Sequence, residues 1–379
     1  ANMQQTYENT YLFPTSESDG STAQSASVAL DPTTGAVRGL VGRVGGTSNT
    51  TFRNFNYATQ GKRSPGSTIK PLVVYAPALA SGWSINKDLP NKPIDYNGYT
   101  PTNYGDIETE DIPMYQALAN SYNVPAVYLF NQIGIQKGIS YGQKFGLNFD
   151  NVPEELGISL GGGVTASPLQ MAQAYGTFAN DGVMNDAHLI TKIENASGQV
   201  VKSHSQKSKR VLSSSANKKM TNMMLGTFTN GTGVNAAPYG YTMAGKTGTT
   251  ETDFNPDLSG DQWVIGYTPD VVISQWLGFP KTDETHYLTG TSAETASVIF
   301  RNVANSVLPY TEGTSFDNEK NSYQENGIAP VGQETETESP EEDKGFFDTV
   351  KERAAGIVAD AKKAIDEADI PGKAQNAWD

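Results

Sequence analysis

The segment RSPGSTIKPL, residues 63–72, contains a serine and a lysine whose types and spacing are suited to nucleophilic catalysis. Ser67 and Lys70 are three residues apart, so a helix would bring them onto one face. A serine hydroxyl is a weak nucleophile until a nearby base takes its proton. Pro71 is tolerated only in the first turn of a helix, so we expect a helix to begin near Ser67. The Ser67 N–H and hydroxyl then lie at the positive end of the helix dipole.

Two later segments give this pair more weight than it has alone. Ser121-Tyr122-Asn123 and then Lys246-Thr247-Gly248-Thr249 follow it along the chain. A lysine can act as the base only if its pKa falls toward neutrality, which burial and a second cation both favour. Lys246 is a candidate for that second cation.

The three histidines offer poor candidates for a Ser-His-Asp triad. His188, His204 and His286 all lie in polar or turn-like segments. If Ser67 is the nucleophile, lysine is therefore the expected base.

The segment around Lys246 is typical of a strand that binds a peptide. Gly248 lacks a Cβ atom, so we expect a substrate backbone to lie close along an edge strand there. Alternation along a strand places Thr247 and Thr249 on the same side, where their hydroxyls could bind a substrate carboxylate.

The order of predicted elements indicates an α+β fold. Residues 26–44 read as two strands around a DPTTG turn, residues 106–190 as mostly helical, and residues 188–280 as rich in strands. Helical periodicity returns in the segment AETASVIFRNVANSVL, with Ser292 as a candidate N-cap. We expect an antiparallel sheet that joins N- and C-terminal strands, with a helical insertion between them.

Composition excludes several classes of function and divides the chain. The formal charge is −14, which argues against nucleic acid or an anionic membrane surface as the main partner. From Thr311 onward lie 17 acidic and 7 basic residues, so the preceding part carries only −4. There is no cysteine, which removes disulfides and thiolate metal sites. No apolar run is long enough to span a bilayer.

The C-terminal part is predicted to differ from the rest. Residues 311–345 are polar and acidic, which is typical of a disordered linker. Residues 346–370 show helical spacing of apolar residues and predict one amphipathic helix. We favour a helix that folds weakly or packs locally over one that binds a membrane or a partner, because it is not basic.

The three motifs together resemble the transpeptidase domain of class A, bifunctional penicillin-binding proteins of the Gram-positive type, in which S-x-x-K, S-x-N and K-T-G occur in this order. The resemblance covers residues 24–305 roughly and includes the longer segments FNYATQGKRSPGSTIKP, ALANSYNVPAV, GGGVTASPLQMAQAYGTFANDG, MAGKTGTT and WVIGYTPDVVISQWLG. It implies a fold like that of penicillin-binding proteins and serine β-lactamases: a central antiparallel sheet flanked by helices, with an all-helical subdomain.

The resemblance also implies an activity and a role for each motif residue. Ser67 would attack the D-Ala-D-Ala carbonyl of a peptidoglycan stem peptide, release D-Ala and pass the acyl group to an amine, and β-lactams would acylate the same serine. Ser121 would bridge Lys70 and Lys246 and pass a proton to the leaving amine, and Asn123 would orient the substrate amide. The N–H groups of Ser67 and Thr249 would form the oxyanion hole.

Domain boundaries and location follow from the same resemblance. Residues 1–25 would be the end of an interdomain linker and 26–310 the transpeptidase domain. The segment ANMQQTYEN resembles the linker after a glycosyltransferase domain, so we expect that domain and a membrane anchor to precede Ala1. The substrate places the protein on the extracytoplasmic face of the bacterial membrane. No cofactor, metal or nucleic acid is expected.

Several alternatives stay open at the level of sequence. With water as acceptor the enzyme would be a D,D-carboxypeptidase or a β-lactamase, although nothing in the segment PEELGISL singles out Glu154 or Glu155 as a deacylating base. A sensing module without turnover is the alternative from another class. The glycines at 161–163 lack the G-K-[ST] of a phosphate loop, and the acidic residues at 106–111 lack calcium-loop spacing.

Overall fold

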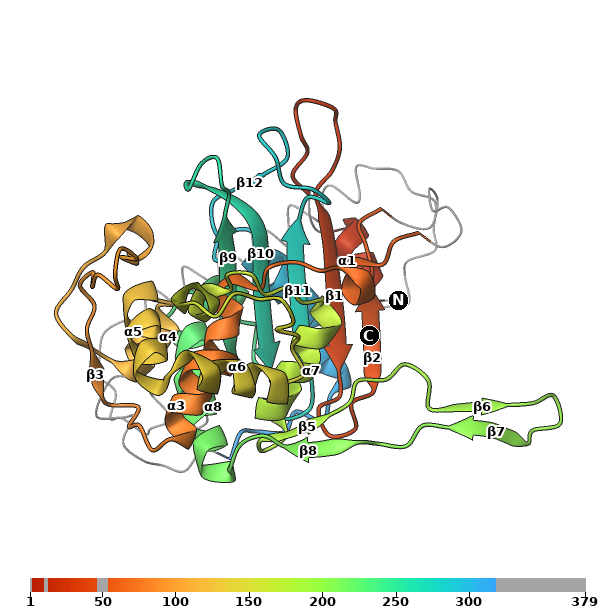
Figure 1. Cartoon of the computed structure of the whole chain (residues 1–379). Helices are drawn as coiled ribbons and strands as arrows, with labels where there is room; N and C mark the ends of the chain where they lie inside the picture. Colours follow the sequence, from red (N-terminus) through yellow and green to blue (C-terminus); the bar gives the residue numbers. More distant parts are fainter. Residues whose placement is uncertain (1, 10–12, 46–53, 318–379) are drawn as a thin grey trace, which may run out of the picture. The chain divides into compact units, whose positions relative to one another are not determined.

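The computed structural model describes residues 2–9, 13–45 and 54–317, all within one compact unit that covers Ala1–Val331. At its centre lies an antiparallel sheet in the order β12-β10-β11-β1-β2, with β9 paired to β10 (Figure 1). Its strands are β1 (Gln24–Leu30), β2 (Val37–Val41), β9 (Ala244–Glu251), β10 (Leu258–Tyr267), β11 (Val272–Gly278) and β12 (Leu288–Thr289). The predicted hairpin is β1 and β2, and β1 pairs with β11. The expected joining of N- and C-terminal strands is therefore confirmed.

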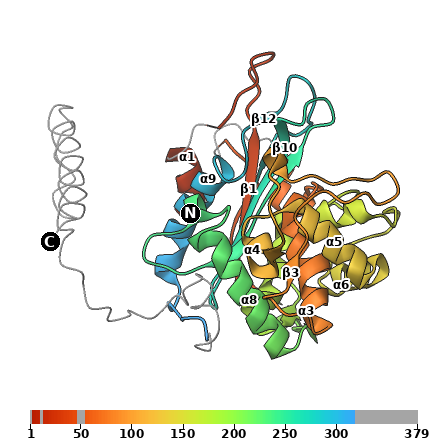
Figure 2. The same ribbon diagram turned by 90° about the vertical axis from the view of Figure 1, so that its left-hand side faces the viewer.

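Helices cover both faces of this sheet, so its inner strands are buried throughout. Along β10, Trp263 and Ile265 enter one apolar cluster and Val264 enters the other. On one side lie α1 (Asn2–Asn9) and α9 (Ala296–Val307), and on the other lie the helices of the central part of the chain (Figure 2). This two-layer burial is the reason that β10 and β11 read as nearly continuous apolar runs.

The predicted helical stretch contains four helices separated by loops. They are α4 (Met114–Ala119), α5 (Asn123–Ile133), α6 (Ile135–Lys144) and α7 (Pro168–Ala179). The Ser167 hydroxyl oxygen accepts from the Gln170 N–H, and the Ser167 N–H donates to Gln170 Oε1, so the two bonds form a capping box at α7. Two short strands, β3 (Asp88–Leu89) and β4 (Ile112–Pro113), pair beside α4. The acidic segment 106–111 is exposed, as expected of a solvated loop.

The region 188–280 is only partly the strand-rich segment predicted. It contains the sheet strands β9, β10 and β11 and the small pair of β6 (Lys192–Glu194) with β7 (Val200–Ser203). It also contains β8 (Ser208–Arg210), which pairs with β5 (Val183–Asn185) just upstream of the region. However, it also contains α8 (Ser214–Thr229), a helix of 16 residues that the strand prediction missed. Its signal was present: Ser213 caps the Ala216 N–H, and Met220 and Met224 follow at helical spacing. Glycine, asparagine and threonine in the segment obscured it because they are weak helix formers.

The C-terminal helix forms where predicted, but its cap differs. α9 begins at Ala296 with Thr295 at the N-cap position, and Ser292 lies further upstream. At the other end of the chain, Met3 and Tyr7 of α1 are buried in the same cluster as α9. Of the predicted linker 311–345 the structure describes only residues to Asp317, and the predicted helix 346–370 lies outside the described residues. Within the described ranges, no helix has the length and hydropathy to cross a bilayer.

Candidate active site

Ser67 lies at the tip of a tight turn that opens a buried helical segment. Gly66 has a φ of 50°, in the left-handed region that favours glycine. The chain then forms the 3₁₀ turn η2 (Gly66–Ile69), the π-helical turn η3 (Pro71–Tyr75) and α3 (Ala76–Ala80). Pro71 is the first residue of η3, so the helical segment begins near Ser67 as predicted. Ser67 itself is partly exposed, while Lys70 is fully buried.

The Lys70 ammonium is held by the loop that precedes α5. Its Nζ donates to the Ser121 carbonyl oxygen at 2.6 Å, to the Tyr122 carbonyl oxygen at 3.2 Å and to Asn123 Oδ1 at 2.8 Å. Burial lowers the pKa of Lys70 well below its usual value, and the positive charge of Lys246 lowers it further. The first two motifs therefore meet at Lys70.

Ser121 contributes through its backbone in a strained conformation. Its φ is 59°, which non-glycine residues seldom adopt. In this conformation the Ser121 carbonyl oxygen accepts the hydrogen bond from Lys70 Nζ. Ser121 lines a cavity together with Ser67, and its hydroxyl is hydrogen-bonded to neither lysine in this structure.

Asn123 is fixed by a residue that the sequence analysis did not single out. Its Oδ1 accepts from Lys70, and its Nδ2 donates to the Thr102 carbonyl oxygen at 3.0 Å. The nearly buried Asn103 accepts from the Asn123 N–H at 2.8 Å and from the Val124 N–H at 3.1 Å, so it caps α5 from another loop. A cap so far away in sequence has no local pattern that would reveal it.

Lys246 lies on β9 and is fully buried. Burial lowers its pKa to about 7, and its Nζ donates to the Thr247 carbonyl oxygen at 2.9 Å. Two buried lysines of lowered pKa are thus present at the site. At neutral pH this pair can hold a proton and also supply a neutral amine, as a base for a serine requires.

Gly248 has a packing role in addition to the one predicted for it. A Cβ at this position would lie 2.9 Å from the Pro65 carbonyl oxygen and 3.0 Å from the Thr68 backbone nitrogen. The missing side chain therefore accommodates the turn that carries Ser67, rather than only a substrate. β9 has no second neighbouring strand opposite β10 among the described strands, so the predicted edge position is confirmed.

Both threonines of β9 line the cavity as predicted, and each is paired with a hydroxyl that the sequence analysis did not assign to the site. Thr247 Oγ1 lies 2.5 Å from Thr232 Oγ1. Thr249 Oγ1 donates to Ser292 Oγ at 3.0 Å and accepts from the Ser292 N–H at 3.0 Å. All four residues line the same cavity.

Two cavities of the described structure meet at Ser67. One, of about 350 Å³, contains the hydroxyl pairs and Ser121. The other, of about 640 Å³, lies against Gly161 and Gly162. Ser67, Asn123, Thr249 and Glu251 line both. The arrangement can hold two chains, or two halves of one chain, on either side of the serine hydroxyl.

Of the glycines at 161–163, Gly161 packs against the turn that carries Ser67. A Cβ on Gly161 would lie 2.8 Å from the Gly66 backbone nitrogen, and the Ser64 hydroxyl donates to the Gly161 carbonyl oxygen at 3.3 Å. Glu154 and Glu155 are exposed and line neither cavity.

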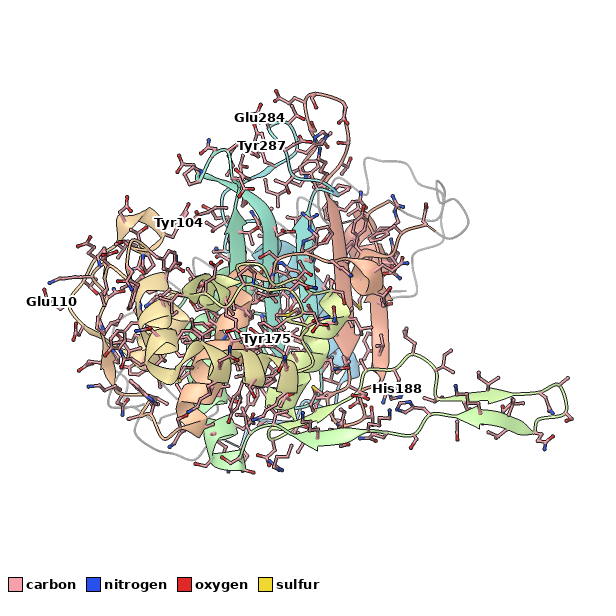
Figure 3. The ribbon with its side chains drawn as sticks, in the orientation of Figure 1. Tyr104, Glu110, Tyr175, His188, Glu284 and Tyr287 are labelled. Atoms are coloured by element: carbon pink, nitrogen blue, oxygen red, sulfur yellow. The ribbon has the colours of Figure 1, made fainter. Side chains whose placement is uncertain are left out.

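The histidines lie away from Ser67. His188 and His204 stack at 3.7 Å between ring centroids at the base of the β6–β7 hairpin, where Figure 3 labels His188. His286 forms ion pairs with Asp283 and Asp19. No histidine lines either cavity at the serine, as expected from residues that were poor candidates for a Ser-His-Asp triad. Among the described residues, no cluster of histidine, aspartate or glutamate could hold a metal ion.

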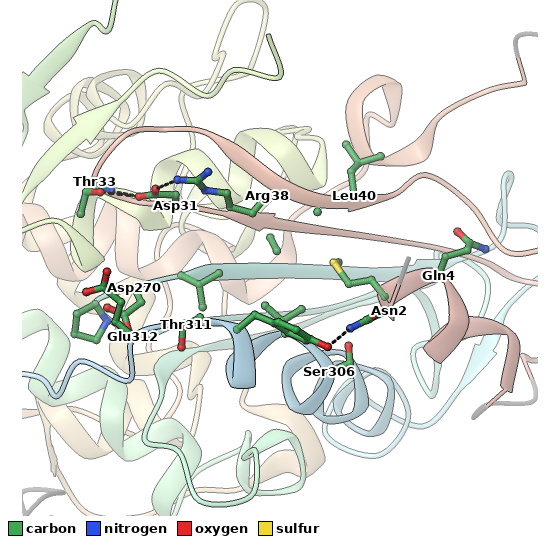
Figure 4. A pocket seen from close by; sticks show the side chains of 17 residues that line it. Asn2, Gln4, Asp31, Thr33, Arg38, Leu40, Asp270, Ser306, Thr311 and Glu312 are labelled. Carbon is green, nitrogen blue, oxygen red and sulfur yellow. Dashed lines mark hydrogen bonds and ion pairs between the residues drawn. The ribbon is translucent and has the colours of Figure 1, made fainter. Parts of the chain in front are cut away.

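A further cavity of about 610 Å³ lies on the α1 and α9 side of the sheet (Figure 4). Its wall carries the ion pair of Arg38 with Asp31 and a hydrogen bond from Asn2 Nδ2 to the Tyr310 hydroxyl. None of the predicted site residues lines it.

Comparisons with known proteins agree with this geometry. Residues 25–305 match the family model described as penicillin binding protein transpeptidase domain. The chain is 56% identical to penicillin-binding protein 2a of Streptococcus pneumoniae over all of its own length and 52% of that protein, and 35% identical to penicillin-binding protein 1F of Bacillus subtilis over 72% of the chain and 37% of that protein. It thus spans about half or less of these relatives. The structure of PonA1 from Mycobacterium tuberculosis in complex with penicillin V has a TM-score of 0.71 at 23% identity, covering 83% of this chain and 84% of that one, which supports the fold.

Proposed function

Since the chain belongs to the transpeptidase-domain family of penicillin-binding proteins, we propose that it is a serine-type D,D-transpeptidase that cross-links peptidoglycan stem peptides. The observation that carries the proposal is that Ser67 lies where two cavities meet, with Thr247 and Thr249 in the wall of one of them. Two buried lysines of lowered pKa lie on the adjoining segments, Lys70 three residues after Ser67 and Lys246 on β9. A binding module has no need for a lysine of lowered pKa so close in sequence to an accessible serine.

In the acylation step, the Ser67 oxygen forms a bond to the carbonyl carbon of the penultimate D-Ala. Neutral Lys70 takes the hydroxyl proton, and the N–H groups of Ser67 and Thr249 stabilise the oxyanion. The C–N bond then breaks, and a proton passes through the Ser121 hydroxyl to the leaving amine of D-Ala. Thr247 and Thr249 bind the terminal carboxylate of the donor.

In the second step, an amine of another stem peptide attacks the acyl-enzyme. This amine loses a proton and the Ser67 oxygen regains one, so the site returns to its starting state. The attacking amine takes the place of the departed amine, so it approaches from the cavity that held D-Ala. A β-lactam forms the same ester with Ser67, and its amine stays attached to the acyl group.

Intact-protein mass spectrometry after mixing with benzylpenicillin tests the assignment. We expect one adduct of penicillin mass on the wild type and none on Ser67→Ala. The matched control is Ser197→Ala, which removes an exposed hydroxyl in the turn between β6 and β7, outside both cavities, and should keep the adduct. A Ser67→Ala protein that is folded and still labelled would overturn the assignment.

Turnover separates the alternatives. Transfer of the acyl group from a thioester donor to an added amine supports transpeptidation. Release to water alone favours a D,D-carboxypeptidase, and rapid hydrolysis of penicillin favours a β-lactamase. A single equivalent of product without turnover favours a sensing module. Peptidoglycan lies outside the cytoplasmic membrane, so we propose that the enzyme acts on that face; the glycosyltransferase domain and the membrane anchor stay predictions.

A further inference from the structure

Ser292 lies in the loop between β12 and α9, and it is held against Thr249 by reciprocal hydrogen bonds. Its N–H donates to Thr249 Oγ1, and the Thr249 hydroxyl donates to Ser292 Oγ, both at 3.0 Å. Ser292 is 3% exposed and lines the cavity of about 350 Å³ beside Ser67. The contact therefore joins two segments of the cavity wall that are far apart in sequence.

The loop that carries Ser292 is fixed from both sides. The Gly290 carbonyl oxygen accepts from the Ser259 hydroxyl at 3.0 Å, and the Thr291 N–H donates to Glu294 Oε2 at 2.8 Å. The Ser292 carbonyl oxygen accepts from the Ser297 N–H at 2.9 Å. These bonds anchor the loop to β10 and to the start of α9, and they thereby fix the position of the Ser292 hydroxyl.

The cavity must recognise a carboxylate without a cation in its wall. Among the described residues that line it, the charged ones are Glu251 and Asp257, and both are acidic. A carboxylate only accepts hydrogen bonds, so it depends on hydroxyl protons that point into the cavity.

The Ser292 contact controls one of those protons. The Ser292 N–H already donates to Thr249 Oγ1. The Thr249 hydroxyl can itself donate one hydrogen bond, either to Ser292 Oγ or to a ligand. Donation of a hydrogen bond to a hydroxyl oxygen also polarises that hydroxyl and makes it a better donor.

We propose that Ser292 is a positioning residue that acts through Thr249, holding its hydroxyl ready for the terminal carboxylate of the donor peptide. The proposal rests on the proposed function and extends it to a residue outside the three motifs. The Thr249 proton bonds Ser292 Oγ in the empty site and turns to the carboxylate when the donor binds. The two bonds to Ser292 thus hold the Thr249 side chain in one position before the substrate arrives.

The test compares acylation by two probes, benzylpenicillin, whose carboxylate stands in for that of D-Ala, and its methyl ester, which has no charge. In Ser292→Ala the backbone N–H remains and only the hydroxyl is lost. We expect the second-order rate constant for benzylpenicillin to fall about five- to tenfold, because the freed Thr249 side chain must then be ordered as the carboxylate binds, while the slower rate for the ester stays unchanged. Ser292→Thr, which keeps the hydroxyl, should restore the rate with benzylpenicillin.

Ser297→Ala is the matched control. Its hydroxyl is fully buried in the next turn and has no hydrogen-bond partner, so its removal should leave both rates unchanged. An equal fall for both probes in Ser292→Ala would indicate a structural role and overturn the proposal, as would an unchanged rate for benzylpenicillin. A wild-type protein that benzylpenicillin does not acylate would instead refute the proposed function itself.

Discussion

Replacement of Gly248 by alanine probes the packing that brings β9, the strand of Thr247 and Thr249, against the turn of Ser67. The added Cβ would lie 2.9 Å from the Pro65 carbonyl oxygen and 2.9 Å from Thr68 Cγ2. Carbon atoms in contact prefer about 3.5–4.0 Å, so β9 and η2 must separate by about half an ångström. The strand cannot retreat freely, because on its other edge it pairs with β10, where Gly248 faces Trp263.

The expected cost has two parts. Overpacking of this kind lowers the free energy of unfolding by about 1–3 kcal/mol. In addition, the separation moves Thr249 relative to Ser67, and misplacement on the scale of 1 Å costs about a hundredfold in rate. For a shift of half that size we expect acylation by a fluorescent penicillin to slow by about tenfold or more.

The assay measures the acylation rate and urea unfolding for the same preparations. Gly39→Ala is the control within the same sheet, since its Cβ would meet only the flexible end of the Met3 side chain, at 2.6 Å from the sulfur. That variant should lose some stability and keep the acylation rate of the wild type. If Gly248→Ala had both the stability and the rate of the wild type, our account of this contact would be refuted.

Further predictions concern the buried charges and the distant cap. Replacing Lys246 by glutamine removes a charge that lowers the pKa of Lys70, so the pKa of Lys70 should rise. The acidic limb of the pH profile for acylation should then move to higher pH. An unmoved limb would mean that the charge of Lys246 has no effect on Lys70. Because the folded-state pKa of Lys246 is about 7 and its usual value is 10.5, the unfolded chain binds more protons between these values. Its contribution to stability should therefore rise with pH across this window, and urea titrations should show a flatter dependence in the glutamine variant. Asn103→Ala leaves the N–H groups of Asn123 and Val124 without their acceptor and should lower the free energy of unfolding by about 2 kcal/mol. Asn103→Asp keeps an acceptor oxygen and should recover part of this loss. Equal stability of the wild type and Asn103→Ala would contradict the capping role.

Local chemistry explains which parts of the fold could be predicted. The DPTTG turn between two β-prone runs is a hairpin signal, and β1 and β2 form there. The 16-residue helix α8 was missed because its weak helix formers obscured the spacing of its methionines, and long-range packing stabilises it.

The sequence by itself determined which residues make up the candidate site. Pro71 requires a helical segment to begin just before it, so Ser67 had to lie at its start, and the alternation of a strand placed Thr247 and Thr249 on one side. The order of the three motifs, and their occurrence in one chain, indicated that their residues lie in one site.

Only the tertiary structure decided how these residues are held. Three contacts join segments that are far apart in the chain. Lys70 donates to backbone carbonyls of the Ser121 loop, Gly248 leaves room for the Ser67 turn, and Ser292 pairs with Thr249. Helix and strand periodicities describe neighbours within a few residues, whereas such contacts depend on how completed elements pack, so no local pattern encodes them.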